Sequence, residues 1–355
     1  MPTPRAVDAI DTPAVLIDID RAQANIERAQ AYADRHGLRL RPHVKTHKLP
    51  FWARRQVEAG AAGITCQKIG EAEVMADAGL SDIFLPYNII GRSKLERLAA
   101  LHRRVALSVT ADSKETLDGL AGAFTDAGHR LRVLVECDTG MGRCGVQTPA
   151  AAVQLASEIE RVPGLRFGGL MTYPPAGRPD DASRFLSESK AGLIASGLDC
   201  GLVSSGGTPD MWRAHESEAV GEYRPGTYIY LDRYQVAKGA GTAGDCALTV
   251  LATVVSRPTP SRAIVDAGSK ALSSDTLGMP DFGELVEFPG ARLSGLSEEH
   301  GHVALAEDTA PRIGDRVRIL PNHACVVSNL FDAVYLVSGE EVVDILPVAA
   351  RGRVT

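Results

Sequence analysis

Between about residue 14 and residue 230, short apolar runs alternate with longer amphipathic stretches. The apolar runs predict strands near residues 38–41, 63–65, 83–86, 105–109, 131–136, 166–171, 201–204 and 227–231. The amphipathic stretches predict helices that include residues 70–78, 93–102, 113–127, 149–161 and 179–196. Alternation of this kind is typical of parallel strands with crossover helices. Eight such units would close a (β/α)8 barrel of the TIM type.

A doubly wound open sheet is the competing fold for the same alternation. Its dinucleotide-binding version is disfavoured, because no Gly-x-Gly-x-x-Gly motif opens a helix after the first strand. After about residue 243 the pattern changes to runs rich in β-branched residues, such as residues 247–256 and 317–320. These runs predict a smaller antiparallel β domain. We therefore expect an α/β chain with a barrel over residues 12–240 and a β domain over residues 241–355, which also takes residues 1–11.

Composition and charge narrow the classes of function. The chain has 355 residues, is 45% hydrophobic and 23% charged, and carries a net charge of -6 without a long block of one sign. This charge pattern disfavours nucleic acid or an anionic membrane surface as a partner. No apolar run approaches the length of a membrane span. The N-terminal residues lack the apolar core of a signal peptide, so we expect a cytoplasmic protein whose six cysteines are thiols.

A basic segment, residues 41–48 (RPHVKTHK), follows the first predicted barrel strand. Neighbouring positive charge lowers the pKa of a lysine and makes its amine a nucleophile, and the same charge suits a bound anion. Lys45 in this cluster of imidazole, ammonium and guanidinium groups fits a Schiff base with pyridoxal phosphate (PLP). A solvated basic turn without chemistry is the alternative.

Two later segments could hold a phosphate. Residues 203–209 (VSSGGTP) place two glycines between hydroxyl residues, after a predicted strand and before a helical stretch, where an anion is favoured. Residues 222–228 (EYRPGTY) place another turn at the start of the predicted eighth strand. Barrels often bind phosphate at the loops after their last strands, which supports this interpretation. The alternative is an ordinary Gly-Gly turn with a helix cap.

A metal site is predicted in residues 320–326 (LPNHACV). In an extended chain His323 and Cys325 would point to the same side, and an imidazole with a thiolate suits Zn²⁺, and Mn²⁺ less well. A core histidine beside a buried thiol is the alternative. His300 and His302 could complete the site or lie on a surface turn. Two weaker candidates are Arg143, in a turn-rich loop, and Gln67, after the second strand.

Together these segments resemble the D-threonine aldolase and D-serine dehydratase family within the alanine-racemase-like, fold type III PLP enzymes. The resemblance extends from about Thr12 to about Pro347. It is carried by residues 41–48 (RPHVKTHK), 65–68 (TCQK), Glu73, 205–208 (SGGT), 224–227 (RPGT) and 321–325 (PNHAC). It implies a PLP barrel with a C-terminal β domain that carries the metal ligands. It also implies a head-to-tail homodimer in which the partner's β domain completes each active site.

The resemblance assigns roles to individual residues. Lys45 would form the Schiff base, with His43 as a second catalytic candidate. His323 and Cys325 would bind a divalent metal, Mn²⁺, Zn²⁺ or Mg²⁺, beside the β-hydroxyl of the substrate. The candidate cofactor-binding residues are Lys45, Gln67, Tyr173, Ser205, Gly206, Gly207, Thr208, Arg224, Gly226 and Thr227.

The implied reaction is the cleavage of β-hydroxy-D-amino acids, with D-threonine giving glycine and acetaldehyde. D-threonine aldolases often have an aspartate two residues after the metal histidine, whereas Cys325 here matches the dehydratase branch. D-serine dehydratase and 3-hydroxy-D-aspartate lyase are therefore the alternatives. An amino-acid racemase and a non-catalytic PLP-binding protein are further alternatives, although the latter are usually single barrels without a β domain.

Overall fold

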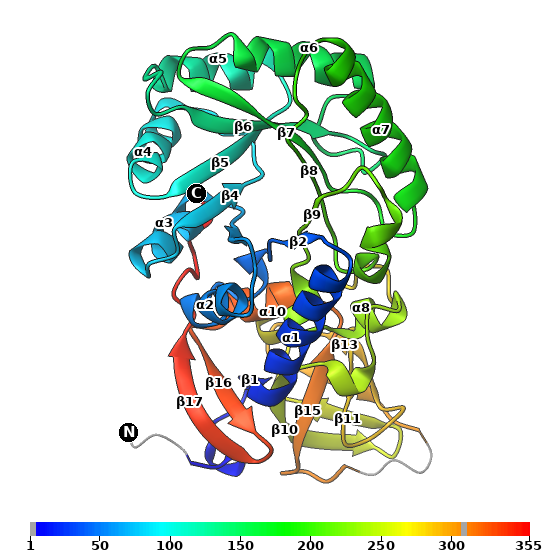
Figure 1. Ribbon diagram of the computed structural model, residues 1–355. Coiled ribbons are helices and arrows are strands. Elements are labelled where there is room, and N and C mark those ends of the chain that lie inside the picture. The colour runs from blue at the N-terminus through cyan, green and yellow to red at the C-terminus, as the bar shows by residue number, and fades with distance from the viewer. Residues whose placement is uncertain (1–4, 307–310) are drawn as a thin grey trace. The chain divides into compact units, whose positions relative to one another are not determined.

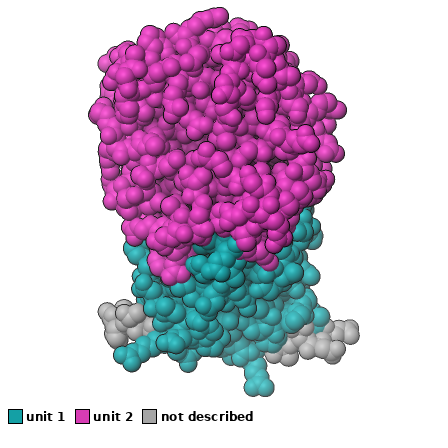
Figure 2. Space-filling model, in the orientation of Figure 1, with its two compact units in different colours: residues 1–27, 46–49, 227–352 teal, residues 28–45, 50–226, 353–355 magenta. Residues whose placement is uncertain are grey.

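The computed structural model describes residues 5–306 and 311–355, and within them the chain forms two compact units (Figure 2). The barrel unit comprises residues 28–45, 50–226 and 353–355. The β unit comprises residues 46–49 and the described parts of 1–27 and 227–352. Each unit is therefore assembled from segments that lie far apart in the sequence.

The barrel unit contains eight parallel strands in the order β2-β9-β8-β7-β6-β5-β4-β3 (Figure 1). A parallel bridge between His43, after β2, and Thr65, in β3, joins the two ends of this order and closes the barrel. The strands are β2 (Arg39–Leu40), β3 (Ile64–Thr65), β4 (Asp82–Leu85), β5 (Ala106–Ala111), β6 (Leu131–Cys137), β7 (Leu165–Thr172), β8 (Leu202–Ser205) and β9 (Glu222–Tyr223). This architecture confirms the predicted (β/α)8 fold.

Two helices of the barrel unit start at residues whose side chains satisfy a free backbone N–H group. Ser113 accepts the N–H of Thr116 at the start of α5, and Thr148 accepts the N–H of Ala151 at the start of α6. The helices are α1 (Ile19–Arg35), which contributes to both units, α2 (Pro50–Glu58), α3 (Ile69–Asp77), α4 (Arg92–His102), α5 (Lys114–Ala123), α6 (Pro149–Glu160) and α7 (Pro179–Ala195). Within the described ranges, none of the helices combines the length and the apolar character that a membrane crossing requires.

The β unit contains a nine-stranded sheet in the order β11-β14-β13-β12-β15-β10-β1-β16-β17. Its neighbouring strands are antiparallel apart from the parallel pair β1 and β16. The strands are β1 (Ala14–Asp18), β10 (Leu248–Thr259), β11 (Arg262–Val265), β12 (Gly283–Leu285), β13 (Arg292–Leu296), β14 (Gly301–Ala304), β15 (Arg316–Pro321), β16 (Ala333–Ser338) and β17 (Glu341–Pro347). The predicted antiparallel β domain is thus confirmed, and its runs 247–256 and 317–320 correspond to β10 and β15.

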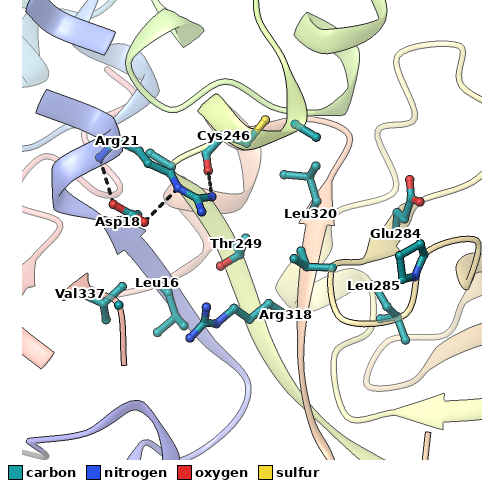
Figure 3. Close-up of a pocket in the computed structure, with 15 residues that line it drawn as sticks. Leu16, Asp18, Arg21, Cys246, Thr249, Glu284, Leu285, Arg318, Leu320 and Val337 are labelled. Atoms are coloured by element: carbon teal, nitrogen blue, oxygen red, sulfur yellow. Dashed lines mark hydrogen bonds and ion pairs between the residues drawn. The ribbon is translucent and has the colours of Figure 1, made fainter. Parts of the chain in front are cut away.

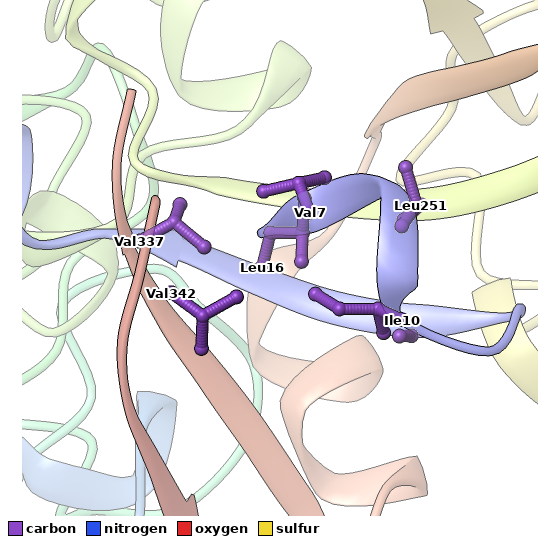
Figure 4. Packing of buried hydrophobic residues seen from close by; sticks show 7 residues of the cluster. Val7, Ile10, Leu16, Leu251, Val337 and Val342 are labelled. Carbon is purple, nitrogen blue, oxygen red and sulfur yellow. The ribbon is translucent and has the colours of Figure 1, made fainter. Parts of the chain in front are cut away.

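The β unit has its own hydrophobic core. Val7 and Ile10 pack on Leu16 of β1, together with Leu251 of β10 and Val337 of β16 (Figure 4). The unit also contains the helices α8 (Arg233–Ala237), α9 (Ser269–Leu272) and α10 (Ala324–Leu330). The described residues also form the 3-10 helices η1 (Val7–Ala9), η2 (Val44–Thr46), η3 (Met211–Glu216), η4 (Thr227–Ile229) and η5 (Ala243–Asp245).

The predicted strand at residues 227–231 is wrong. The eighth barrel strand is β9, at Glu222–Tyr223, and residues 227–229 form η4. The N–H of Leu231 donates to the carbonyl of Thr227 at 2.7 Å, which closes a helical turn. Residues 227–231 are buried, which accounts for their apolar character. Apolar character alone does not distinguish a buried strand from a buried helical turn. Residues 224–227 consequently follow the last strand rather than precede it.

The compact units divide at different residues from the predicted domain limits of 12–240 and 241–355. The units place β1 and the segment from residue 227 onward with the β unit. β1 pairs with β10 and β16, so its hydrogen bonds are made inside the nine-stranded sheet. The domain limits themselves stay a prediction.

Candidate functional site

Lys45 lies in η2, directly after the first barrel strand, where the loops of a (β/α)8 barrel carry its chemistry. The nearby guanidinium of Arg41 is buried and ion-paired, with Nε 2.8 Å from Glu222 Oε2 and Nη1 2.7 Å from Asp82 Oδ1. The expectation that Arg41 adds unbalanced positive charge beside the lysine is therefore wrong, because two carboxylates neutralise it. The sequence offered no indication of these partners, which lie 41 and 181 residues away.

His43 is a neutral imidazole in this arrangement. Burial, and then the charge of Lys45, hold the pKa of His43 well below its ordinary value. Its Nε2 lies 3.0 Å from Gln67 Oε1, and its Nδ1 accepts the backbone N–H of Lys45 at 3.4 Å. An Nε2–H tautomer satisfies both contacts, since Gln67 Oε1 can only accept. The structure thus brings His43, Gln67 and the backbone of Lys45 together.

Ser205 is the last residue of β8, and residues 206–208 begin the turn that follows this strand. A Cβ on Gly206 would lie 2.7 Å from the carbonyl oxygen of Arg224, and Gly207 has φ +142, so both positions need glycine. The hydroxyl of Tyr223 donates to the carbonyl of Gly207 at 2.9 Å and holds the turn. Thr208 Oγ1 is buried and has no hydrogen-bond partner among the described residues. A small acceptor such as a phosphate oxygen would satisfy that hydroxyl, so the turn fits such a group.

Arg224 is buried beneath this turn. Its Nη2 donates to the carbonyl of Thr172 at 2.7 Å and its Nη1 donates to Ser204 Oγ, which donates to Glu222 Oε1 at 2.7 Å. Burial lowers the pKa of Arg224 to about 10. Burial would raise the pKa of Glu222, but Arg41, Ser204 and Arg224 together lower it. Arg224 therefore braces the segment before the turn by bonds within the protein.

Tyr173 follows β7, and the guanidinium of Arg143 lies 4.9 Å from the centre of its ring. The loop that carries Arg143 is shaped by Asp138, whose Oδ1 accepts the N–H groups of Gly140 and Gly142 at 3.0 and 3.1 Å. At the end of β6, burial raises the pKa of Glu136 to about 7. Glu136 was not among the predicted site residues, although an acidic residue at the end of an apolar strand was a usable signal.

His323 and Cys325 lie together in the β unit, but not on a strand as the sequence suggested. His323 is the N-cap of α10, and Cys325 is the second residue of that helix. The helical turn, rather than strand alternation, brings the two side chains within hydrogen-bond reach. This contact raises the pKa of His323 to about 9, against the effect of burial. It also lowers the pKa of Cys325, although burial alone would raise it.

Two hydroxyls also contact the thiol. Thr46 Oγ1 and Thr227 Oγ1 lie 3.1 and 3.2 Å from Cys325 Sγ. Thr227, a predicted phosphate ligand, thus contacts the thiol, and the preceding residue Gly226 lies in the bend after β9. An imidazole, a polarised thiol and open positions suit a divalent ion of the Zn²⁺ type.

The other predicted metal candidates lie elsewhere. His302 is in β14, where its Nε2 lies 3.2 Å from Ser297 Oγ, and His300 is exposed in the turn before it. Among residues 5–306 and 311–355, no three His, Cys, Asp or Glu side chains gather as a metal cluster. Asp275 was not predicted from the sequence, because 48 residues separate it from His323; its Oδ2 lies 2.7 Å from His323 Nδ1.

The β unit also contains a cavity of about 350 Å³ (Figure 3). Leu16, Thr249 and Leu320 line it from neighbouring strands, and Arg21 and Arg318 also border it. Asp18 and the carbonyl of Cys246 bind the Arg21 guanidinium. None of the predicted site residues lines this cavity.

Two family models match the chain. The model "Alanine racemase, N-terminal domain" matches residues 17–234, and the model "Putative serine dehydratase domain" matches residues 247–337. A D-threonine aldolase from Arthrobacter sp is 35% identical, over 97% of this chain and 93% of that protein. A D-threo-3-hydroxyaspartate dehydratase from Delftia sp. is also 35% identical, over 91% of this chain and 93% of that protein.

The solved structures agree with these relatives. The crystal structure of D-threonine aldolase from Filomicrobium marinum has a TM-score of 0.92 and 34% identity, and covers 100% of both chains. Two variants of a D-threo-3-hydroxyaspartate dehydratase are also similar to the chain. Their TM-scores are 0.87 and 0.85 and their identities 32% and 33%, and the matches cover 96% and 97% of this chain and 96% and 99% of those chains. A histidine is replaced by alanine in the first variant. In the second, which is in the metal-free form, a cysteine two positions further on is replaced.

The family models match residues in both units, and the relatives align along almost the whole chain. Both comparisons indicate the same family. The chain belongs to the D-threonine aldolase and D-serine dehydratase family of alanine-racemase-like proteins, and it is a lyase.

Proposed function

We propose that the chain is a PLP- and divalent-metal-dependent lyase that cleaves β-hydroxy-D-amino acids, with D-threonine as the principal substrate. The barrel unit supports the cofactor: Lys45 offers the amine, and the segment at residues 205–208 offers a buried hydroxyl on Thr208 that no described residue contacts by a hydrogen bond. PLP, when bound, supplies an electron sink for charge that develops at the substrate Cα. Gln67, Tyr173 and the residues 224–227 complete the proposed cofactor-binding set.

The residues around Lys45 suit proton transfer. His43 is neutral, and its Nδ1 accepts the Lys45 N–H, so the imidazole orients the lysine segment without adding charge to it. Gln67 fixes the opposite nitrogen of the same ring. We infer that Lys45 acts at Cα and that His43 holds the segment in position.

The imidazole–thiol pair of His323 and Cys325 is the observation that carries the choice of a lyase over a racemase, since a racemase has no need of a metal. A divalent ion held by this pair would polarise the β-oxygen of a substrate. The two dehydratase variants support the assignment, because a histidine and a cysteine with this spacing were replaced there and the cysteine variant is in the metal-free form.

One assay separates the aldolase from its main rival. The purified protein with D-threonine, PLP and Mn²⁺ or Zn²⁺ should release glycine and acetaldehyde. Release of 2-oxobutanoate and ammonia would instead identify a dehydratase. Cys325 favours this second candidate, which acts on D-serine or 3-hydroxy-D-aspartate, because a cysteine at this position resembles the dehydratase branch. Its thiolate also suits Zn²⁺ better than Mn²⁺ or Mg²⁺.

The cofactor is tested separately. The protein with PLP should absorb near roughly 420 nm, and borohydride should fix the cofactor on Lys45. Lys45→Arg should abolish the band and lower turnover by at least about 100-fold, because arginine keeps the charge but cannot supply a free amine. A variant that stays equally yellow and active would rule out Lys45. Complete resistance of turnover to EDTA would favour a racemase, and absence of turnover on any D-amino acid would favour a PLP-binding protein.

We also propose that the protein is a homodimer. The family resemblance supports this assembly. Sedimentation equilibrium of the holoprotein should give twice the chain mass of 37.7 kDa, and a monomer at micromolar concentration would contradict it.

A further inference from the structure

A short loop between α9 and β12 carries unusual backbone strain. Ser273 and Leu277 have φ values of 65 and 50, in the left-handed region that residues with a side chain rarely adopt. Two such residues within five positions persist only where the surroundings fix them, and strain of this kind gathers at functional sites. Asp275 lies midway between them.

The loop holds the carboxylate of Asp275 in one orientation. The backbone N–H of Asp275 donates to Ser273 Oγ at 3.1 Å, and Asp275 Oδ1 accepts the N–H of Leu277 at 3.1 Å. The other oxygen, Oδ2, lies 2.7 Å from Nδ1 of His323. One oxygen thus fixes the loop while the second contacts the imidazole.

The contact determines which nitrogen of His323 is available. A carboxylate only accepts hydrogen bonds, so Asp275 requires a proton on Nδ1. Nε2 is then the nitrogen that can carry a lone pair toward a metal. The backbone next to the imidazole is fixed as well, because Asp232 Oδ2 accepts the N–H of Ala324 at 2.9 Å.

We propose that Asp275 is the positioning residue of the metal site: it holds His323 in the Nδ1–H form, so that Nε2 and the Cys325 sulfur present a preformed pair of ligands. Carboxylates that orient a ligating histidine in this way also raise its basicity as a ligand. The proposal rests on the metal site of the proposed function. It adds a residue to that site that the sequence motif does not contain.

The test measures metal affinity rather than turnover. Metal-free protein is titrated with Co²⁺, whose visible and near-ultraviolet absorbance reports thiolate and imidazole coordination, and then with Zn²⁺ in competition. The variants are Asp275→Asn and Asp275→Ala. The control, Asp344→Asn, removes the same charge from an exposed position on β17. Circular dichroism shows whether each variant is folded.

Asp275→Ala should weaken binding of both ions by about 10- to 100-fold and shift the Co²⁺ bands, because the imidazole loses its anchor. Asp275→Asn should also weaken it, since the one amide oxygen cannot accept both the Leu277 N–H and the Nδ1–H, and an NH2 group facing the imidazole cannot accept the Nδ1 proton. The control should match the wild type. The amide oxygen of the asparagine variant can retain the loop bond to Leu277, so this variant decides the matter if the alanine variant does not fold.

Two failures are distinguishable. If the wild type binds Co²⁺ with the same affinity as Cys325→Ala, the proposed metal site itself is wrong. If the wild type depends on Cys325 but both Asp275 variants bind Co²⁺ and Zn²⁺ as tightly as the wild type, Asp275 is only a surface partner of His323 and this inference is overturned.

Discussion

Thr208 has a buried hydroxyl that the described protein leaves without a partner. An unpaired buried hydroxyl destabilises the apoprotein, and a phosphate would satisfy it. Thr208→Val should therefore weaken PLP binding by about tenfold, the equivalent of one hydrogen bond, while the apoprotein becomes equally or more stable. Fluorescence titration with PLP and thermal unfolding without PLP measure the two effects.

A matched control for Thr208→Val is Ser157→Ala, which removes a hydroxyl bonded to the carbonyl of Val153 within α6. This control should leave PLP affinity unchanged. Unaltered affinity in Thr208→Val would show that the hydroxyl is not a phosphate ligand.

Glu136 gives the protein a defined pH dependence. Its pKa in the folded state is about 7, raised by burial from the ordinary 4.5. Between these two pH values the folded state binds more protons than the unfolded state, so stability falls as pH rises, by about 3 kcal/mol in all. Glu136→Gln should remove this slope and be more stable than the wild type above pH 7. Urea unfolding of the apoprotein between pH 5 and pH 8 measures it, and parallel slopes for both proteins would contradict it.

At the scale of elements, a single carboxylate joins three barrel strands. Glu222 in β9 accepts from Arg41, which follows β2, and from Ser204 in β8. Both bonds lie close to predicted cofactor residues, because Arg41 precedes Lys45 by four positions and Ser204 precedes the turn at residues 205–208. β9 has only two residues and makes few backbone hydrogen bonds, so these side-chain hydrogen bonds help to hold it beside its neighbouring strands.

Glu222→Gln should consequently destabilise the apoprotein by about 3–5 kcal/mol, since it leaves the buried charge of Arg41 without its buried partner. Asp82→Asn serves as the control, because it removes the second partner of the same guanidinium at a half-exposed position and should cost less. Urea unfolding followed by circular dichroism gives both values. Equal losses in the two variants would show that Glu222 has no special part in the barrel.

The elements also explain which sequence predictions failed. The amphipathic patterns placed α3, α4, α6 and α7 within a few residues, because each buries one face against the barrel. The run at residues 227–231 gave no periodic signal, and its hydrogen bonds, rather than its composition, make it η4. His323 and Cys325 were correctly seen as neighbours for an incorrect reason, since α10 rather than a strand brings them together.

At the scale of the whole molecule, two units with separate cores hold different parts of the proposed chemistry. The lysine and the glycine turn belong to the barrel unit, and the imidazole–thiol pair belongs to the β unit. Asp232 caps the start of α10 by accepting the N–H of Ala324, so the backbone of this helix is held by groups other than a metal.

Removal of metal with EDTA should therefore abolish turnover of D-threonine and leave the absorbance near roughly 420 nm and the circular dichroism spectrum in place. The melting temperature should fall only by the amount that metal binding adds to the stability of the folded state. Addition of Zn²⁺ or Mn²⁺ should restore turnover. Loss of the absorbance band together with the metal would mean that the cofactor site depends on the metal.

The sequence by itself determined the fold class, the division into an α/β part and a β-rich part, and the choice of Lys45, His323 and Cys325 as candidate site residues. Local periodicity and short motifs are properties of neighbouring residues, so they can be read without a structure. The tertiary structure decided which charges are balanced, which hydroxyl is unpaired and which carboxylate meets His323. Asp82, Glu222 and Asp275 act on partners 41 to 181 residues away, and only the folded chain brings such residues within hydrogen-bond distance.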